Sequence, residues 1–211
     1  MSAIRGMDRA QLRVQWGLQS VLVGVLAVGL VLPDVSVIVN SVVALAVTAL
    51  PALIERDRQV VLAPLLTLWI SGAATLHALG MVVLYDAIPW WDVLTHLVSG
   101  ALVAGVGYAL VRTLEEYTDS VRLTPPLLGV FVVLFTVAAG VLWEVIEMGG
   151  REIARYFGWE PILTVYGLED TMLDLIVDAV AGVVVAVAGG SFLEGTVHRL
   201  VASLRRGEPD S

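Results

Sequence analysis

The chain has 211 residues, of which 58% are hydrophobic and only 15% are charged, and its mean hydropathy is +0.87. Soluble domains carry about 25% charged residues, so the composition excludes an ordinary soluble domain and predicts a polytopic membrane protein. The net charge of −8 argues against a nucleic-acid partner, and the absence of cysteine excludes disulfides, thiol chemistry and cysteine-based metal sites.

Six apolar stretches, taken in chain order, are long enough to cross a hydrocarbon core of roughly 30 Å as helices. They cover residues 13–32, 35–54, 60–84, 88–112, 124–148 and 170–198. We therefore expect an all-α membrane bundle of about six transmembrane helices, forming a single domain over residues 1–211 with tails at 1–12 and 199–211. The connecting segment 149–169 alternates apolar and charged residues. It is either an interfacial helix that covers the bundle or an ordinary connector.

The arginines predict the orientation of these helices. With the N-terminus inside, ten of the 12 basic residues fall on the inner side, and only Arg151 and Arg155 fall outside. Because inner loops are enriched in basic residues, we expect both termini in the cytoplasm and a multi-pass protein of the plasma membrane. The acidic, lysine-free composition is also typical of a halophilic source.

Among the ionisable residues of the apolar stretches, eight are candidate site residues, and each costs roughly 2.5–3.5 kcal/mol to insert. At about 1.5 Å of rise per residue, all eight fall in the outer half of the membrane under the orientation that arginine predicts. Their spacings of three, four or eight residues place each set on one helix face. The eight are His77, Asp92, His96, Glu144, Glu147, Asp170, Asp174 and Asp178.

The same helix faces carry small residues, which allow neighbouring helices to approach closely. These residues are Gly100, Ala104, Thr136, Gly140 and Ala181. The polar faces are therefore expected to point into the bundle and not towards lipid.

Six carboxylates cannot all be ionised in one low-dielectric pocket, so either several are protonated or cations neutralise them. Two imidazoles among oxygen ligands suit a divalent ion such as Zn, Mn or Fe, or Mg and Ca with fewer imidazoles. The predicted metal ligands are Asp92, His96, Asp170, Asp174, Asp178 and His77, and the predicted general bases are Glu144 and Glu147.

Structural alternatives stay open for part of this set. Asp92 and Asp170 are also placed to stabilise helix N-termini. Glu147 could pair with Arg151 four residues later, and His77 could be a core histidine bonded to a neighbour.

Three motifs carry a resemblance to known families: PWWDVLTHLVSG at residues 89–100, WEVIE at 143–147 and DTMLDLIVDAVAG at 170–182. In this order they resemble the uncharacterised YjdF-like inner-membrane proteins and, more distantly, the VanZ-like family, over roughly residues 50–190. The resemblance implies that the acids and His96 in these motifs are family positions, and it implies a link to the cell envelope but no reaction. Asp178 stands where VanZ-like chains often have asparagine.

These observations leave three hypotheses for function. The first is a metal-dependent hydrolase or transferase in the lipid bilayer, acting on a lipid or isoprenoid substrate at the outer leaflet. The second is a cation or proton transport protein, which is disfavoured because the inner halves of the spans are almost purely apolar in sequence. The third is a structural membrane subunit with a buried polar network.

Overall fold

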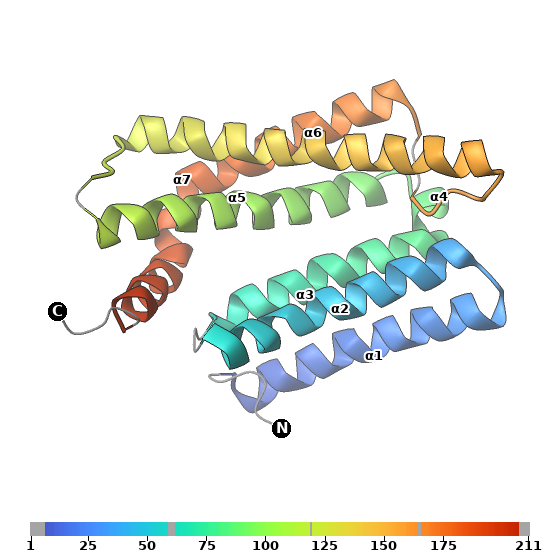
Figure 1. Ribbon diagram of the computed structural model, residues 1–211, viewed down its shortest axis with the longest axis horizontal. Helices are drawn as coiled ribbons and strands as arrows, with labels where there is room; N and C mark the ends of the chain where they lie inside the picture. Colours follow the sequence, from blue (N-terminus) through green and yellow to red (C-terminus); the bar gives the residue numbers. More distant parts are fainter. Residues whose placement is uncertain (1–6, 59–61, 119, 164–165, 207–211) are drawn as a thin grey trace.

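The computed structural model describes residues 7–58, 62–118, 120–163 and 166–206, which are helical with short connections and contain no strand (Figure 1). Within these residues, six helices are long and apolar enough to cross a membrane, which confirms the all-α prediction. The elements are α1 (Arg9–Val31), α2 (Val35–Arg58), α3 (Pro64–Leu79), the π-helical turn η1 (Gly80–Leu84), α4 (Tyr85–Ala87), α5 (Trp91–Tyr117), α6 (Pro125–Phe157) and α7 (Leu168–Arg206).

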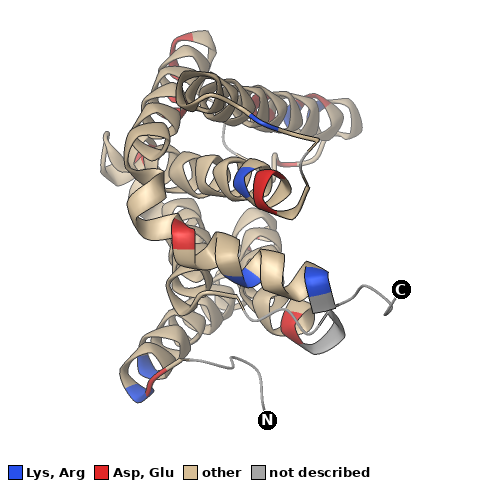
Figure 2. Ribbon diagram, turned by 90° about the vertical axis from the view of Figure 1, so that its left-hand side faces the viewer, with Lys and Arg blue, Asp and Glu red and all other residues tan. Residues whose placement is uncertain are grey.

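The helices form two groups of three, which lie one above the other in Figure 1. In the first group, α1, α2 and α3 pack around Leu22 and Ala78. In the second group, α5, α6 and α7 pack around Ala104, Val132 and Val185. We call the end of the bundle where α1 begins and α7 ends the terminal end, and the opposite end, where α5 begins and α6 ends, the site end. Figure 2 looks at the terminal end and shows charged residues on the helix turns nearest the viewer.

Two tryptophans tie the groups together across the contact between α3 and α5. The indole N–H of Trp69 donates to the carbonyl of Val98 at 3.1 Å, and that of Trp91 donates to the carbonyl of Leu76 at 3.2 Å. An indole N–H that is removed from water needs an acceptor, so these bonds fix the height of α5 against α3.

The last transmembrane helices are longer than the apolar pattern predicts. α6 continues past Gly149 and ends at Phe157, and α7 continues past residue 198 to Arg206. Interior glycine weakens a helix by only about 1 kcal/mol, and an ion pair between Glu152 and Arg155 lies in the last turns of α6. Gly158, with a φ of 69°, ends the helix. The predicted connector 149–169 is therefore reduced to residues 158–167.

The third span is interrupted by the π-helical turn η1, which the sequence pattern did not predict. A side chain at Gly80 would collide with the ring of Tyr85, whose Cζ would be 2.6 Å from the added Cβ. Glycine at position 80 therefore lets the Tyr85 ring fold back over its own helix. π turns of this kind are frequent at functional sites, and this one places the Tyr85 hydroxyl beside His77.

Candidate functional site

A cavity of about 390 Å³ lies between the two helix groups at the site end. Its polar lining comes from helices α2 to α7 and includes His77, Asp92, His96, Glu147 and Asp170. Its apolar lining lies up to roughly 10 Å nearer the terminal end, as judged from the helical rise. This apolar part is formed by Val43, Val47, Ile70, Leu102 and Val103. The cavity is therefore amphipathic, with its charged groups at one end.

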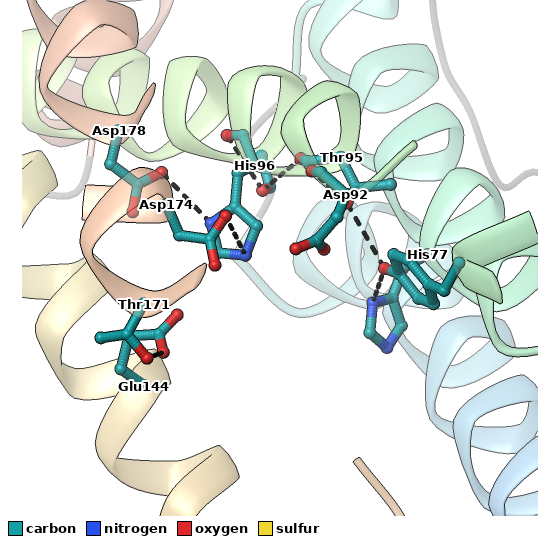
Figure 3. Close-up of polar contacts among 10 residues, drawn as sticks. His77, Asp92, Thr95, His96, Glu144, Thr171, Asp174 and Asp178 are labelled. Carbon is teal, nitrogen blue, oxygen red and sulfur yellow. Dashed lines mark hydrogen bonds and ion pairs between the residues drawn. The ribbon is translucent and has the colours of Figure 1, made fainter. Parts of the chain in front are cut away.

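The closest grouping of ionisable side chains joins α5 to α7. Asp92, His96 and Asp174 each offer one metal-ligand atom, and these atoms lie within 4.8 Å of one another. The imidazole of His96 sits between two aspartates of α7, with Nε2 3.8 Å from Asp174 Oδ1 and Nδ1 3.7 Å from Asp178 Oδ1 (Figure 3). The side chain of His96 is 12% exposed, and both aspartates are buried.

Two glycines make room for the Asp178 carboxylate. A Cβ added to Gly100 on α5 would lie 2.5 Å from Asp178 Oδ1, and one added to Gly140 on α6 would collide with Asp178 Oδ2. Ala181, one turn further along α7, is fully buried. This confirms the expectation that small residues on the polar faces allow α5, α6 and α7 to approach closely.

Two carboxylate oxygens in the site are buried without a hydrogen-bond partner. They are Asp174 Oδ1 and Glu144 Oε1, while the other oxygen of Glu144 accepts a hydrogen bond from the Thr171 hydroxyl at 2.6 Å. Buried polar atoms almost always have a partner. A bound ion, a proton or an ordered water molecule would satisfy these oxygens, and the donor set of one imidazole and several carboxylates fits a divalent cation.

His77 belongs to the same cavity but is engaged by other side chains. Its Nδ1 is 2.9 Å from the Tyr85 hydroxyl, and its Nε2 is 3.1 Å from Asn40 Oδ1. The Tyr85 hydroxyl in turn lies 3.4 Å from Thr95 Oγ1, which donates to the carbonyl of Asp92. With both ring nitrogens occupied, His77 is better placed to position its neighbours than to bind a metal, so its predicted role as a ligand stays a prediction.

Three residues of this network were not singled out from the sequence: Asn40, Tyr85 and Thr95. Neutral polar groups insert into a membrane at lower cost than ionisable ones, so they stand out less within an apolar stretch. Asn40 could have been identified from the sequence, because an amide inside the apolar stretch 35–54 needs hydrogen-bond partners.

The connection between α6 and α7 reaches across the site end to the first helix group. The carbonyl of Ile162 accepts hydrogen bonds from Ser36 Oγ at 2.6 Å and Asn40 Nδ2 at 2.8 Å. Tyr166 lines the cavity and donates to Asp86 Oδ1 at 3.3 Å. Burial and the nearby Asp86 carboxylate raise the pKa of Tyr166 to about 12, so its hydroxyl keeps the proton it donates.

All eight predicted site residues therefore lie at the site end, and they divide by their surroundings. Asp92, His96 and Asp174 form the metal-ligand grouping. Asp178 contacts His96, and Asp170 and Glu147 line the same cavity. Glu144 bonds Thr171, and His77 bonds Tyr85 and Asn40.

Comparison with known proteins gives a family and no activity. A curated protein of Thermotoga maritima, described only as uncharacterized, is 32% identical over 116 residues, which cover 53% of this chain and 54% of that protein. The chain thus spans about half the length of the curated relative it matches, and no solved structure matches it. The sequence matches the family described as "Predicted membrane protein (DUF2238)" over residues 14–195, and the chain belongs to that family.

Proposed function

We propose that this protein is a membrane-embedded enzyme that holds a divalent transition metal at Asp92, His96 and Asp174 and hydrolyses or transfers part of a lipid. The observation that carries the proposal is the convergence of these ligand atoms, within 4.8 Å of one another, beside an amphipathic cavity. The buried Asp174 Oδ1, which has no hydrogen-bond partner, also favours an ion there.

The ligand chemistry favours a transition metal over calcium. Catalytic zinc sites combine imidazole and carboxylate ligands and leave a position open for water or substrate, whereas calcium takes oxygen ligands throughout. Metal-binding histidines usually direct their second ring nitrogen at a carboxylate. Asp178 stands in that position, 3.7 Å from His96 Nδ1, while Nε2 faces Asp174.

The chain's other carboxylates supply candidates for proton transfer. A bound divalent ion would lower the pKa of water or polarise a phosphoryl or acyl oxygen. Glu147 lines the cavity, and Glu144 keeps one buried oxygen without a partner. Either could take the proton of the attacking water, as proposed from the sequence.

The shape of the cavity supports an amphipathic substrate. The charged groups lie at the site end, and the lining towards the terminal end is aliphatic, including Val47, Ile70 and Leu102. A lipid or isoprenoid could place its head group at the Asp–His cluster and its chain along these side chains. We further propose that the substrate enters from the outer leaflet and that the protein acts in the cell envelope. The resemblance of its motifs to YjdF-like and VanZ-like proteins supports this role.

Metal content tests the proposal directly. The protein is purified without a histidine tag, incubated with Zn, Mn or Fe, desalted and measured by inductively coupled plasma mass spectrometry. We expect the wild type to retain bound metal, and His96→Ala and Asp174→Asn to lose it because each removes a ligand. His198→Ala is the matched control, since His198 lies near the terminal end of α7 and its side chain is 60% exposed.

Two outcomes would contradict the proposal. One is a folded wild type that retains no metal after incubation. The other is metal retention in both site variants at the wild-type level. Full tolerance of neutral substitutions at Asp92, His96 and Asp174 would instead support the structural-subunit hypothesis.

A further inference from the structure

A second cavity, of about 680 Å³, lies at the terminal end of the second helix group. Three segments border it: the last turns of α5, the connection between α5 and α6, and the last turns of α7. Figure 2 looks at this end of the molecule. Arg112, which lines this cavity, follows His96 on α5 by 16 residues, or about 24 Å of helix. This terminal cavity is therefore separate from the candidate site.

The polar lining of the terminal cavity carries an excess of positive charge. Three arginines line it, against the two carboxylates of Glu115 and Glu116. His198 also lines it and adds a second excess positive charge when it is protonated. The excess is opposite in sign to the net charge of −8 on the whole chain. The three arginines are Arg112, Arg122 and Arg205.

The buried side chain of Glu115 holds two of the bordering segments together. One of its carboxylate oxygens accepts a hydrogen bond from Arg112 Nη1 at 2.7 Å, and the other accepts one from the backbone N–H of Leu123 at 2.6 Å. Hydrogen bonds to an ionised group are short and strong. Glu115 therefore fixes the guanidinium of Arg112 and the connection that carries Arg122 at the end of α5.

Glu116 lies among three cationic side chains. Arg112 Nη2 is 3.6 Å from its Oε1, and His198 Nε2 is 3.8 Å from its Oε2. Both separations are longer than those of strong hydrogen bonds. Arg205 Nη2 donates to the backbone carbonyl of Glu116 at 3.1 Å. Because that carbonyl is neutral, the bond places the Arg205 guanidinium at the cavity without neutralising its charge.

Phosphate is the anion that this arrangement suits best. Guanidinium groups present forked N–H donors that match phosphate oxygens, and basic pockets between transmembrane helices at the cytoplasmic surface bind anionic lipid headgroups. Under the orientation that the arginines predict, the terminal end faces the cytoplasm, where the leaflet is rich in such lipids. Val201 and Ala202 give the cavity an apolar wall as well, against which the first carbons of a lipid can pack.

We propose that the terminal cavity binds a phosphate group beside Arg112, Arg122 and Arg205, and that an anionic lipid of the adjacent leaflet carries this group. The excess of one positive charge matches the single negative charge of a phosphodiester. A soluble phosphate ester presents the same chemistry from the aqueous side, so the two sources are tested separately. Metal binding at the Asp–His cluster plays no part in this inference.

Native mass spectrometry in detergent tests the lipid source. The protein is titrated with phosphatidylglycerol, which is anionic, and with phosphatidylcholine of the same acyl chains, which is neutral overall. We expect the wild type to prefer phosphatidylglycerol. An arginine near a membrane surface contributes about fivefold in affinity for anionic lipid. The double variant Arg122→Gln/Arg205→Gln should therefore bind phosphatidylglycerol about 25-fold more weakly.

A matched control removes the same charge at the same end of the molecule. Arg9→Gln/Arg13→Gln replaces two exposed arginines of α1, which lie in the first helix group and outside the cavity, and should leave the affinity near that of the wild type. Equal losses in the two double variants would show a general effect of surface charge and would overturn the inference. So would a folded wild type that does not prefer phosphatidylglycerol and does not bind the soluble ester.

Isothermal titration calorimetry with glycerol 3-phosphate tests the soluble source. We expect no binding, since the proposal assigns the phosphate to a lipid. Binding that Arg122→Gln/Arg205→Gln abolishes, without any preference for phosphatidylglycerol, would support a phosphate site in the cavity and overturn its assignment to a lipid.

A second variant is expected to change the affinity in the opposite direction. Glu116→Gln removes a carboxylate from the cavity and frees Arg112 and His198 from its charge, so phosphatidylglycerol should bind about fivefold more tightly. Misfolding does not produce tighter binding, so this test holds even if an arginine variant fails to fold. Unchanged or weaker binding would contradict the proposal. Metal retention should equal that of the wild type in every variant of the cavity, which separates this inference from the proposed function.

Discussion

Gly140 leaves the space that the Asp178 carboxylate occupies. In Gly140→Ala, the added methyl group meets the Asp178 carboxylate, with Cγ at 3.2 Å and Leu175 Cδ2 at 3.3 Å. The carboxylate has little room to retreat, since Gly100 bounds it on the α5 side. Overpacking of this kind costs typically about 1–3 kcal/mol, so we expect a lower unfolding temperature in detergent and weaker metal retention.

Gly129→Ala is the control on the same helix. The nearest atom to its added Cβ would be Ala186 Cβ at 3.8 Å, an ordinary contact, and alanine favours a helix interior over glycine. Stability should be unchanged or slightly raised. Equal effects of the two substitutions would mean that Asp178 is not confined as described.

The Tyr85 hydroxyl holds His77 in place. Tyr85→Phe keeps the ring over Gly80 but removes the partner of His77 Nδ1 at 2.9 Å and of Thr95 at 3.4 Å. An unsatisfied buried nitrogen costs about 1–3 kcal/mol, so thermal unfolding should occur at a lower temperature. Tyr156→Phe, at a side chain that is 84% exposed, should leave the unfolding temperature unchanged. No difference between the two variants would argue against a structural bond to His77.

Charged residues of the site were predictable from the sequence, and their neutral partners were less so. An aspartate such as Asp174 in an apolar stretch is costly enough to demand an explanation. Tyr85 is ordinary near a membrane interface, and its role depends on the π turn at Gly80, which leaves no periodic signal in the sequence. The neutral part of the site therefore needed the structure.

At the scale of the element, the end of α6 was the least predictable feature. Gly149 and Gly150 and the charges after them indicate a break, yet the helix continues to Phe157. A hydropathy pattern reports where a helix leaves the apolar core, and it does not report where the helix itself ends. The left-handed Gly158, with a φ of 69°, was the local signal for the true end.

Two glycine substitutions test this boundary. Gly158→Ala places a β-carbon at a left-handed position, which costs roughly 1–2 kcal/mol, and should destabilise the last turn of α6. Gly150→Ala has nothing within 4 Å of the added Cβ and should stabilise a continuous helix by roughly 0.5–1 kcal/mol. Thermal unfolding in detergent measures both. Destabilisation by Gly150→Ala would indicate that α6 breaks at the glycine pair after all.

At the scale of the whole molecule, the site exists because two helix groups meet. The sequence indicates which face of each helix is polar, but not which helices are neighbours. His96 on α5 faces Asp174 and Asp178 on α7, while His77 on α3 faces Asn40 on α2 and Tyr85. The polar residues predicted as one cluster thus divide into an Asp–His grouping between α5 and α7 and a network around His77, and the Tyr85–Thr95 contact joins the two.

The orientation of the molecule in the bilayer decides which leaflet supplies the substrate. Ten of the twelve arginines lie on one side of the predicted spans, so we expect the site end to face outwards.

The chain has no cysteine, so single introduced cysteines report the topology without background labelling. An impermeant maleimide should label Glu160→Cys, in the exposed connection after α6, on intact cells. Ser120→Cys, between α5 and α6, should react only after the membrane is permeabilised, and both should react then. The reverse labelling pattern would place the Asp–His cluster at the cytoplasmic leaflet. The chemistry of the proposed site would stand, but the proposed substrate would have to be a lipid presented from the inner side.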